Sequence, residues 1–217
     1  MTLQSDAARA DLAYAGFHRG LGETARASGA LRAVEELYCA VPDATLISGP
    51  TGHAVVPVAQ LPEAPPPLAP LEGCGLAFVR ADPVRASQNP DDQRALVAAL
   101  AWLRLGLSRR LLDACFGHLG KRTAHDEPLM HQQLIKGALA DVATAQMEAE
   151  TVLLAAGLDT AMLGDLHHQI TGADRMLLRL LGAFGFTVDG PGREALLSEL
   201  IADAYICYSH AETGATS

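Results

Sequence analysis

The 217-residue chain has the length of one large domain or two small ones, which is enough to bury a core. Hydrophobic residues make up 49% of it and aromatic residues only 5%; most of the apolar residues are Ala and Leu, which favours helices. The formal net charge of −9 argues against a general nucleic-acid or anionic-membrane surface, because such surfaces need concentrated Lys and Arg. Any contact with phosphate must therefore be local.

Cysteine spacing and apolar runs limit the compartment in which the protein is expected. The four cysteines form no CxxC pair and the N-terminus has no basic-then-apolar signal, so we expect reduced thiols and a cytoplasmic protein. The most apolar run, residues 95–107, contains Arg104 and is too short to span a bilayer. We therefore predict a core helix there and no membrane span.

The first part of the chain contains two segments with different sequence patterns. Residues 1–40 carry helical patterns interrupted by Gly20, Gly22 and Gly29, which predict an N-terminal helical segment. Between residues 41 and 86, many prolines and glycines forbid a long helix, while short strands are indicated by TLISG, HAVVPV and GLAFVRA. This stretch predicts a reduced β insert; the alternative is an extended linker with a hairpin.

From Asp91 onward the pattern is helical. Four helices are predicted, at about residues 91–120, 128–156, 160–182 and 193–208. Their short connections imply an antiparallel four-helix bundle over residues 87–210, followed by a disordered tail at 211–217. The predicted fold class is therefore mainly α, with a four-helix bundle preceded by a short helical segment and a reduced β insert.

The turn between the first two of these helices has the composition of an anion site. Lys121 and Arg122 close one helix, and Pro128 follows an acidic pair before the next. Such a turn offers an anion a guanidinium, an ammonium group and the free N–H groups of a helix start. For Arg122, the alternative is an ordinary partner of the helix dipole.

Two sequence elements carry a resemblance to a known family. The first contains Gly106, the turn KRTAHDEPL and the following QQLI and LADV; the second is RLLGAFGFTVDGP, residues 179–191. The first matches in one ungapped register, and both resemble the C-terminal helical domain of the acyl-CoA dehydrogenase family. The family's arginine, proline, glutamine and acid correspond to Arg122, Pro128, Gln133 and Asp141.

The resemblance implies a flavin contact. Members of that family remove a proton next to a thioester and pass hydride to FAD, which lies between paired subunits. The resemblance implies that the turn at Arg122 reaches the partner subunit's FAD. Among the residues expected near the flavin, this sequence departs from the family at two positions: His125 replaces an aromatic residue and Arg179 replaces a glutamine. The implied cofactor-binding residues are Arg122, His125, Gln133, Arg179 and Gly182.

Ordinary structural interpretations compete with these roles. Gln133 could cap the neighbouring turn, Arg179 could form a surface salt bridge, and Gly182 could serve only a tight turn. No metal site is predicted, because the histidines around the turn match no ordinary ligand spacing. The adjacent His167 and His168 point to different sides of a helix and are expected on its surface or at an interface.

The resemblance also implies missing chemistry. Fewer residues precede Asp91 than a complete N-terminal bundle and β domain need, so most of the flavin and acyl pocket would be absent. The family's catalytic glutamate falls on Ile206, or on Leu96 in members that carry it elsewhere, and neither side chain accepts a proton. The expected function is a subunit of a hetero-oligomer, with a full-length acyl-CoA dehydrogenase-like partner that catalyses FAD-dependent α,β-dehydrogenation of an acyl thioester.

Two other functions stay open. A non-catalytic scaffold would keep the bundle for assembly and bind no flavin. An enzyme that had reused the fold for dehydration or cyclisation of a thioester-bound intermediate would depend on a residue such as Asp203 or His210.

Overall fold

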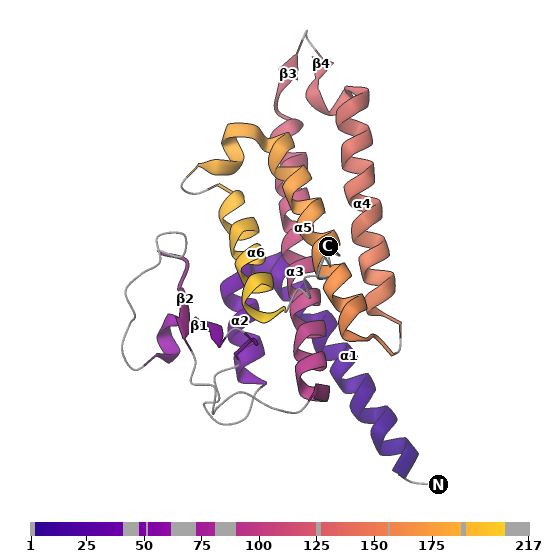
Figure 1. The fold of residues 1–217 in the computed structure, drawn as a ribbon. Coiled ribbons are helices and arrows are strands. Elements are labelled where there is room, and N and C mark those ends of the chain that lie inside the picture. Colours follow the sequence, from indigo (N-terminus) through magenta and orange to yellow (C-terminus); the bar gives the residue numbers. More distant parts are fainter. Residues whose placement is uncertain are drawn as a thin grey trace, which may run out of the picture.

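The structure is a computed structural model that describes residues 3–40, 48–50, 52–61, 73–80, 90–124, 127–155, 157–187 and 190–206. Within these ranges the chain forms six α-helices and two small antiparallel sheets, so the predicted fold class, mainly α with a small β part, is confirmed (Figure 1). The helices are α1 (Leu3–Ser28), α2 (Ala30–Cys39), α3 (Pro90–Leu119), α4 (Gln133–Leu153), α5 (Thr160–Leu181) and α6 (Gly192–Tyr205). The strands are β1 (His53–Pro57), β2 (Leu76–Arg80), β3 (Thr123–Ala124) and β4 (Glu127–Pro128).

The central helix of the molecule is α3, which packs against α1, α4, α5 and α6. Every residue from 99 to 108 is buried, because neighbouring helices cover all sides of this apolar stretch. This confirms the prediction of a core helix. Among the described helices, none is long and apolar enough to cross a membrane.

Close contact between α1 and α3 depends on two glycines. A Cβ atom built on Gly106 would lie 2.1 Å from the carbonyl oxygen of Gly22, so the two backbones touch at this crossing. The expectation that Gly20 and Gly22 interrupt the N-terminal helix is wrong, since α1 continues through both. The break comes at Gly29, whose φ of 84° lies in the left-handed region.

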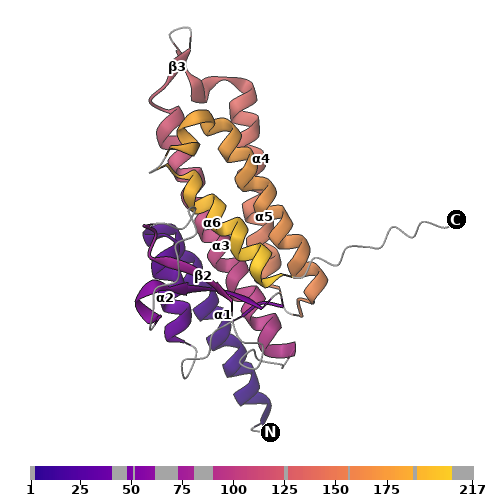
Figure 2. The same cartoon turned by 60° about the vertical axis from the view of Figure 1, so that its left-hand side comes forward.

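The β part is a hairpin of β1 and β2, paired antiparallel from His53↔Arg80 to Pro57↔Leu76. It lies beside α2 and the C-terminal half of α6 (Figure 2). The Val55 N–H donates a hydrogen bond to the Tyr205 hydroxyl at 2.9 Å, which ties the hairpin to α6. The two later predicted strands are confirmed; residues 45–47 of the first lie outside the described residues, and 48–49 form no strand.

The helix boundaries agree with the sequence except at the start of α4. The prediction placed this start near Pro128, but the chain first forms β4 and a 3₁₀ turn (Leu129–His131). Pro128 has φ −56° and ψ 136°, an extended conformation outside the helical region, so it is not a residue of the helix. The helix therefore begins at Gln133 and ends at Leu153, before Gly157.

Candidate functional site

Four of the five candidate cofactor residues lie at one end of the bundle, because α3 to α6 run alternately in opposite directions (Figure 1). Arg122 follows the end of α3, and Gln133 is the first residue of α4. Arg179 lies in the last turn of α5, and Gly182 follows it. The antiparallel topology thus gathers four residues that are distant in sequence at the upper end of the bundle in Figure 1.

The turn that carries Arg122 has a fixed backbone. β3 and β4 pair through Thr123↔Pro128 and Ala124↔Glu127. The Arg122 carbonyl accepts a hydrogen bond from the Leu129 N–H at 2.8 Å, which closes the base of this small hairpin. His125 lies at the tip, outside the described residues, so its predicted role stays a prediction.

Two guanidinium groups at this end are uncommitted. Arg122 and Arg179 are both exposed, and neither side chain forms a hydrogen bond or ion pair with any residue that the structure describes. The alternative interpretation of Arg179 as a surface salt bridge therefore finds no partner within the described ranges. Guanidinium groups in this state can bind a phosphate or diphosphate group through several N–H donors.

The ordinary interpretation finds no support for Gln133 and some support for Gly182. Gln133 is exposed, and no side-chain hydrogen bond caps the start of α4, so the structure shows no capping role for it. Gly182 has φ 56° at the end of α5, and a Cβ atom there would meet no atom within 4 Å. Its backbone conformation, rather than close packing, requires glycine.

An aromatic pair joins the same end of the bundle. The rings of His118 and Phe184 stack with centroids 4.1 Å apart and planes 4° apart. His118 lies in the last turn of α3 and Phe184 in the 3₁₀ segment after α5 (Gly182–Phe186). Sequence reasoning missed this pair, because only the tertiary fold brings the two helix ends together. Phe184 keeps 42% of its surface exposed, and Phe186 keeps 74%.

The two positions of the family's glutamate lie at the opposite end. Leu96 is near the start of α3 and packs against the core, and Ile206 is buried immediately after α6. α3 has 30 residues, so Leu96 and Arg122 are on the order of 40 Å apart. Neither Leu96 nor Ile206 offers a proton acceptor.

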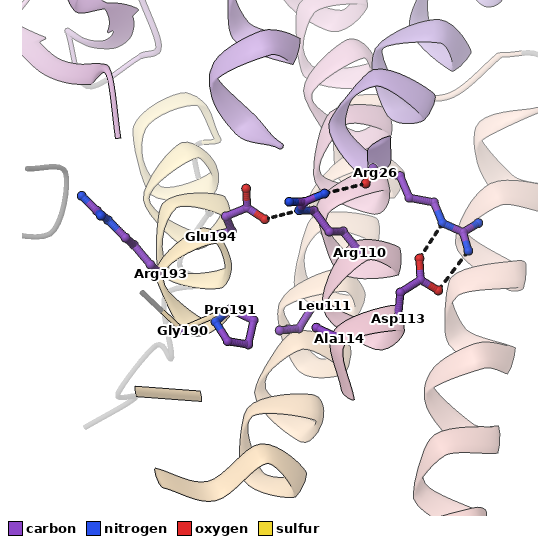
Figure 3. Close-up of a pocket in the computed structure, with 9 residues that line it drawn as sticks. All are labelled: Arg26, Arg110, Leu111, Asp113, Ala114, Gly190, Pro191, Arg193 and Glu194. Carbon is purple, nitrogen blue, oxygen red and sulfur yellow. Dashed lines mark hydrogen bonds and ion pairs between the residues drawn. The ribbon is translucent and has the colours of Figure 1, made fainter. Parts of the chain in front are cut away.

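A pocket of about 560 Å³ lies between α1, α3 and α6 (Figure 3). The charged residues that line it are Arg26, Arg110, Asp113, Arg193 and Glu194. Arg26 donates two hydrogen bonds to the Asp113 carboxylate, at 2.9 and 3.0 Å. Sequence reasoning did not identify this pocket, because its residues come from three helices that are far apart along the chain.

Arg110 connects all three helices around that pocket. Its Nε donates to Glu194 Oε2 at 2.8 Å, and its Nη1 donates to the carbonyl oxygens of Arg26 and Ala27 at 3.2 Å. These carbonyl oxygens belong to the last turn of α1 and have no acceptor role within the helix. Arg110 therefore both caps α1 and holds α6 against α3.

A buried polar network crosses the bundle core. The completely buried Arg104 donates to Ser198 Oγ at 3.0 Å, to Thr171 Oγ1 at 2.7 Å and to the carbonyl oxygen of His167 at 3.1 Å. Its Nη1 also lies 2.9 Å from His167 Nδ1, which must accept because a guanidinium only donates. His167 Nε2 therefore carries the proton, 3.1 Å from the carbonyl oxygen of Val97.

The prediction of a surface or interface position for His167 is wrong. Its side chain is completely buried, whereas His168 is exposed as expected. Burial and the Arg104 charge lower the pKa of His167 to about 3, so the ring is neutral. The sequence signal that could have predicted a buried His167 is Arg104, because a charge inside an apolar helix needs polar partners on neighbouring helices.

Asp174 extends the network from α5 to α3 and α6. Ser198 Oγ lies 3.5 Å from its Oδ2, whereas its buried Oδ1 has no hydrogen-bond partner within the described residues. Ser108 on α3 accepts a hydrogen bond from Gln146 Nε2 at 2.9 Å. Burial raises the pKa of Asp174 to about 6, and the nearby serine hydroxyls and the Arg104 charge offset part of that effect. None of these residues lines the pocket of Figure 3, so the network positions helices.

Within the described part of the chain, no group of three or more His, Cys, Asp or Glu residues could hold a metal ion. The uncommitted side chains at the upper end of the bundle are instead suited to an organic anion.

Comparison with known proteins gives a partial likeness of fold. No protein-family model matches the sequence, and no curated protein matches it significantly. Among solved structures, a glutaryl-CoA dehydrogenase from Mycobacterium smegmatis in complex with FADH2 aligns with a TM-score of 0.46 and 20% identity, over 51% of this chain and 32% of that chain.

Two further solved structures are similar to the same degree. FkbI, for biosynthesis of the methoxymalonyl extender unit of the Fk520 polyketide immunosuppressant, aligns with a TM-score of 0.48 and 22% identity, over 69% of this chain and 46% of that chain. A probable acyl-CoA dehydrogenase from Mycobacterium abscessus aligns with a TM-score of 0.46 and 18% identity, over 58% of this chain and 40% of that chain. The chain matches less than half the length of each of these three proteins.

Proposed function

We propose that this chain is an acyl-CoA dehydrogenase-like subunit of a hetero-oligomer that carries out FAD-dependent α,β-dehydrogenation of an acyl thioester. The proposal rests on the sequence motifs shared with that family. In it, a full-length acyl-CoA dehydrogenase-like partner supplies the catalytic base and most of the acyl pocket. This chain supplies the turn at Arg122 and a helical surface for assembly.

The observation that carries the proposal is the convergence of the motif residues. Arg122, Gln133, Arg179 and Gly182 come from separate parts of the sequence, yet they lie at the same end of the bundle. The two guanidinium groups among them have no partner within the described residues. Free cations at a common end are what a shared diphosphate contact needs.

The residues at this end fit the chemistry of FAD. Arg122 and Arg179 would hold its diphosphate, Gln133 would donate a hydrogen bond, and the bend at Gly182 would let the backbone approach. The exposed face of Phe184 offers an aromatic surface for a heterocycle. FAD, when bound, accepts the hydride in this family's reaction.

The residues at the two glutamate positions indicate that the partner subunit, and not this chain, supplies the catalytic base. Leu96 and Ile206 are apolar and packed into the protein, so this chain offers no base at either position. Both are on the order of 40 Å from Arg122 along the bundle. The Arg122 turn would therefore serve a flavin whose reactive part lies in the partner subunit.

The test is co-expression with a full-length acyl-CoA dehydrogenase-like protein encoded beside this chain. We expect the complex to be yellow, with flavin absorbance, and the chain alone to be colourless. Arg122→Ala should lower the FAD content per complex, while Arg94→Ala, at the exposed start of α3, should not. A yellow, active homomer of this chain would contradict the proposal.

The same experiment separates the two alternatives. A scaffold subunit would form the complex, and Arg122→Ala would leave its FAD content unchanged. Non-redox chemistry on a thioester would give turnover without flavin reduction; the exposed Asp203 on α6 is the first side chain to replace in that case.

A further inference from the structure

We propose that the end of the bundle that carries Phe186 and Leu134 is a protein interface, which docks the full-length partner subunit of the proposed function. Phe186 is its principal anchor and enters an apolar pocket of the partner, whose rim is acidic. The identity of this partner rests on the proposed function; the surface itself follows from exposure, rigidity and charge.

The two most exposed large apolar side chains of the described residues lie at this end, the upper end in Figure 1. Leu134, in the first turn of α4, is 88% exposed, and Phe186, at the end of the 3₁₀ segment after α5, is 74% exposed. Phe184 on the same segment is also exposed. Single exposed apolar residues are normal on a protein surface, but their concentration at one end indicates a binding surface.

The buried cluster at this end of the bundle is complete without Phe186. Its buried members come from α3, α4, α5 and α6, and neither Phe184 nor Phe186 belongs to it. The Phe186 ring therefore contributes little to the packing of this chain. An aromatic side chain can bury about 200 Å² when it enters a pocket, and such side chains are frequent anchors of protein interfaces.

The segment that carries Phe186 has a fixed backbone. The Thr187 hydroxyl donates a hydrogen bond to the Phe184 carbonyl oxygen at 3.0 Å. A Cβ atom built on Gly192 would lie 2.1 Å from the Gly185 carbonyl oxygen, so the segment rests directly on the first turn of α6. Because this backbone is already ordered, a partner that binds it loses little conformational entropy.

The charges at this end argue against a second copy of this chain as the occupant. Within residues 120–136 and 179–190, the exposed charged side chains that the structure describes are the cations Lys121, Arg122, Lys136 and Arg179 and the carboxylate Glu127. The end stays positive when the two aspartates of these ranges that lie outside the described residues are counted, although the whole chain carries −9. In a closed dimer this surface would face itself and bring like charges together.

The surface that docks here must therefore carry negative charge. In the proposed function the two arginines face the FAD diphosphate, so Lys121 and Lys136 remain for carboxylates of the partner. Charges at the rim of an interface guide association and specificity, while a central aromatic anchor supplies much of the affinity. The partner subunit is thus expected to offer an apolar pocket with an acidic rim.

The test is the dissociation constant between this chain and the full-length acyl-CoA dehydrogenase-like protein encoded beside it, measured by sedimentation. We expect Phe186→Ser to raise this constant about tenfold or more, because the anchor would be lost. Phe186 is mostly exposed in the free chain, so the variant should keep its melting temperature. Leu154→Ser is the matched control, since Leu154 is 61% exposed and follows α4 at the opposite end of the bundle.

Three outcomes would overturn this interface. One is an equal effect of Phe186→Ser and Leu154→Ser on the dissociation constant. Another is an affinity that added salt does not lower, because an acidic rim would then be absent. The third is a dimer of this chain alone that Phe186→Ser disrupts, which would assign the surface to a second copy.

The FAD contact can fail separately from this interface. If Phe186→Ser weakens the complex while Arg122→Ala leaves its FAD content unchanged, the interface stands and the FAD contact is overturned. If Arg122→Ala lowers the FAD content while Phe186→Ser has no effect on affinity, the FAD contact stands and the interface is overturned. Absence of any complex would overturn both.

Discussion

Arg104 donates a hydrogen bond from Nε to the Ser198 hydroxyl at 3.0 Å, across the completely buried contact between α3 and α6. Ser198 in turn faces Asp174 on α5, and Arg104 also reaches His167 and Thr171 on that helix. One guanidinium thus fixes the rotation of three helices relative to one another. Since buried polar groups need partners, other rotations of these helices would be costly.

Replacing Arg104 should therefore destabilise the fold strongly. Arg104→Met would leave the hydroxyl oxygens of Ser198 and Thr171 and the Nδ1 atom of His167 without the guanidinium donor, and Asp174 without a nearby cation. We expect a loss of about 3 kcal/mol or more in the free energy of unfolding, measured by urea denaturation. Arg94→Met, at an exposed position of the same helix, should change it by less than about 0.5 kcal/mol. Equal stability of the two variants would show that the network is dispensable.

Asp174 should give stability a specific pH dependence. Its pKa is raised from 3.8 to about 6 in the folded protein, so the folded state binds its proton more tightly than the unfolded state. This contribution is complete below the unfolded pKa of 3.8 and is lost as the pH rises through 6. The stability of the wild type relative to Asp174→Asn should therefore fall by roughly 2 kcal/mol between pH 4 and pH 7.

The pKa of His167 changes the stability with pH in the opposite direction, but this effect cancels when the wild type is compared with Asp174→Asn. Its pKa is lowered from 6.5 to about 3, so its contribution is present above pH 6.5 and is lost as the pH falls through 3. Both proteins in the comparison contain His167. Urea denaturation at several pH values measures the difference, and a difference that does not vary with pH would contradict the raised pKa of Asp174.

The crossing of α1 and α3 should not tolerate a methyl group at Gly106. A Cβ atom there would lie 2.1 Å from the Gly22 carbonyl oxygen, so the two helices would have to move apart. We expect Gly106→Ala to cost about 3 kcal/mol, although alanine is the better helix former. Gly117 lies in the same helix, and a Cβ atom built on it would meet no atom within 4 Å. Gly117→Ala should therefore be neutral or stabilising by up to about 1 kcal/mol. Thermal denaturation of both variants tests this contrast.

The hairpin should loosen when its link to α6 is removed. Tyr205→Phe deletes the hydroxyl that accepts the buried Val55 N–H, at a cost of about 1–3 kcal/mol. Hydrogen exchange at Val55 should accelerate more than exchange in the middle of α3, because the lost contact is local to the hairpin. Uniform acceleration across the chain would instead indicate that the hairpin opens only when the whole protein unfolds.

Helix positions were predictable where the signals are local. The start of α5 follows Asp159, whose side chain accepts a hydrogen bond from the Met162 N–H at 2.8 Å, and its end is set by Gly182. Capping and the left-handed conformation of glycine act within one turn, so the sequence alone carries them. The start of α4 was misplaced because Pro128, which is common in first helical turns, here belongs to a strand pair.

The candidate site was predictable only in part. The motif residues Arg122 and Arg179 could be named from the sequence, and the predicted antiparallel order of helices places them at one end. The stack of His118 and Phe184 and the pocket at Arg193 could not be foreseen. Each depends on how far the helices are rotated about their axes, which no local pattern specifies.

The sequence by itself determined the helical class, the core position of α3 and the turn at Arg122, because composition, periodicity and capping act over a few residues. The tertiary structure decided that Arg104 is a buried crosslink rather than an interruption, and that His167 is its partner rather than a surface residue. It also brought Arg26, Arg110 and Arg193 to one pocket. These features depend on contacts between residues far apart in the chain, and packing of whole helices fixes such contacts.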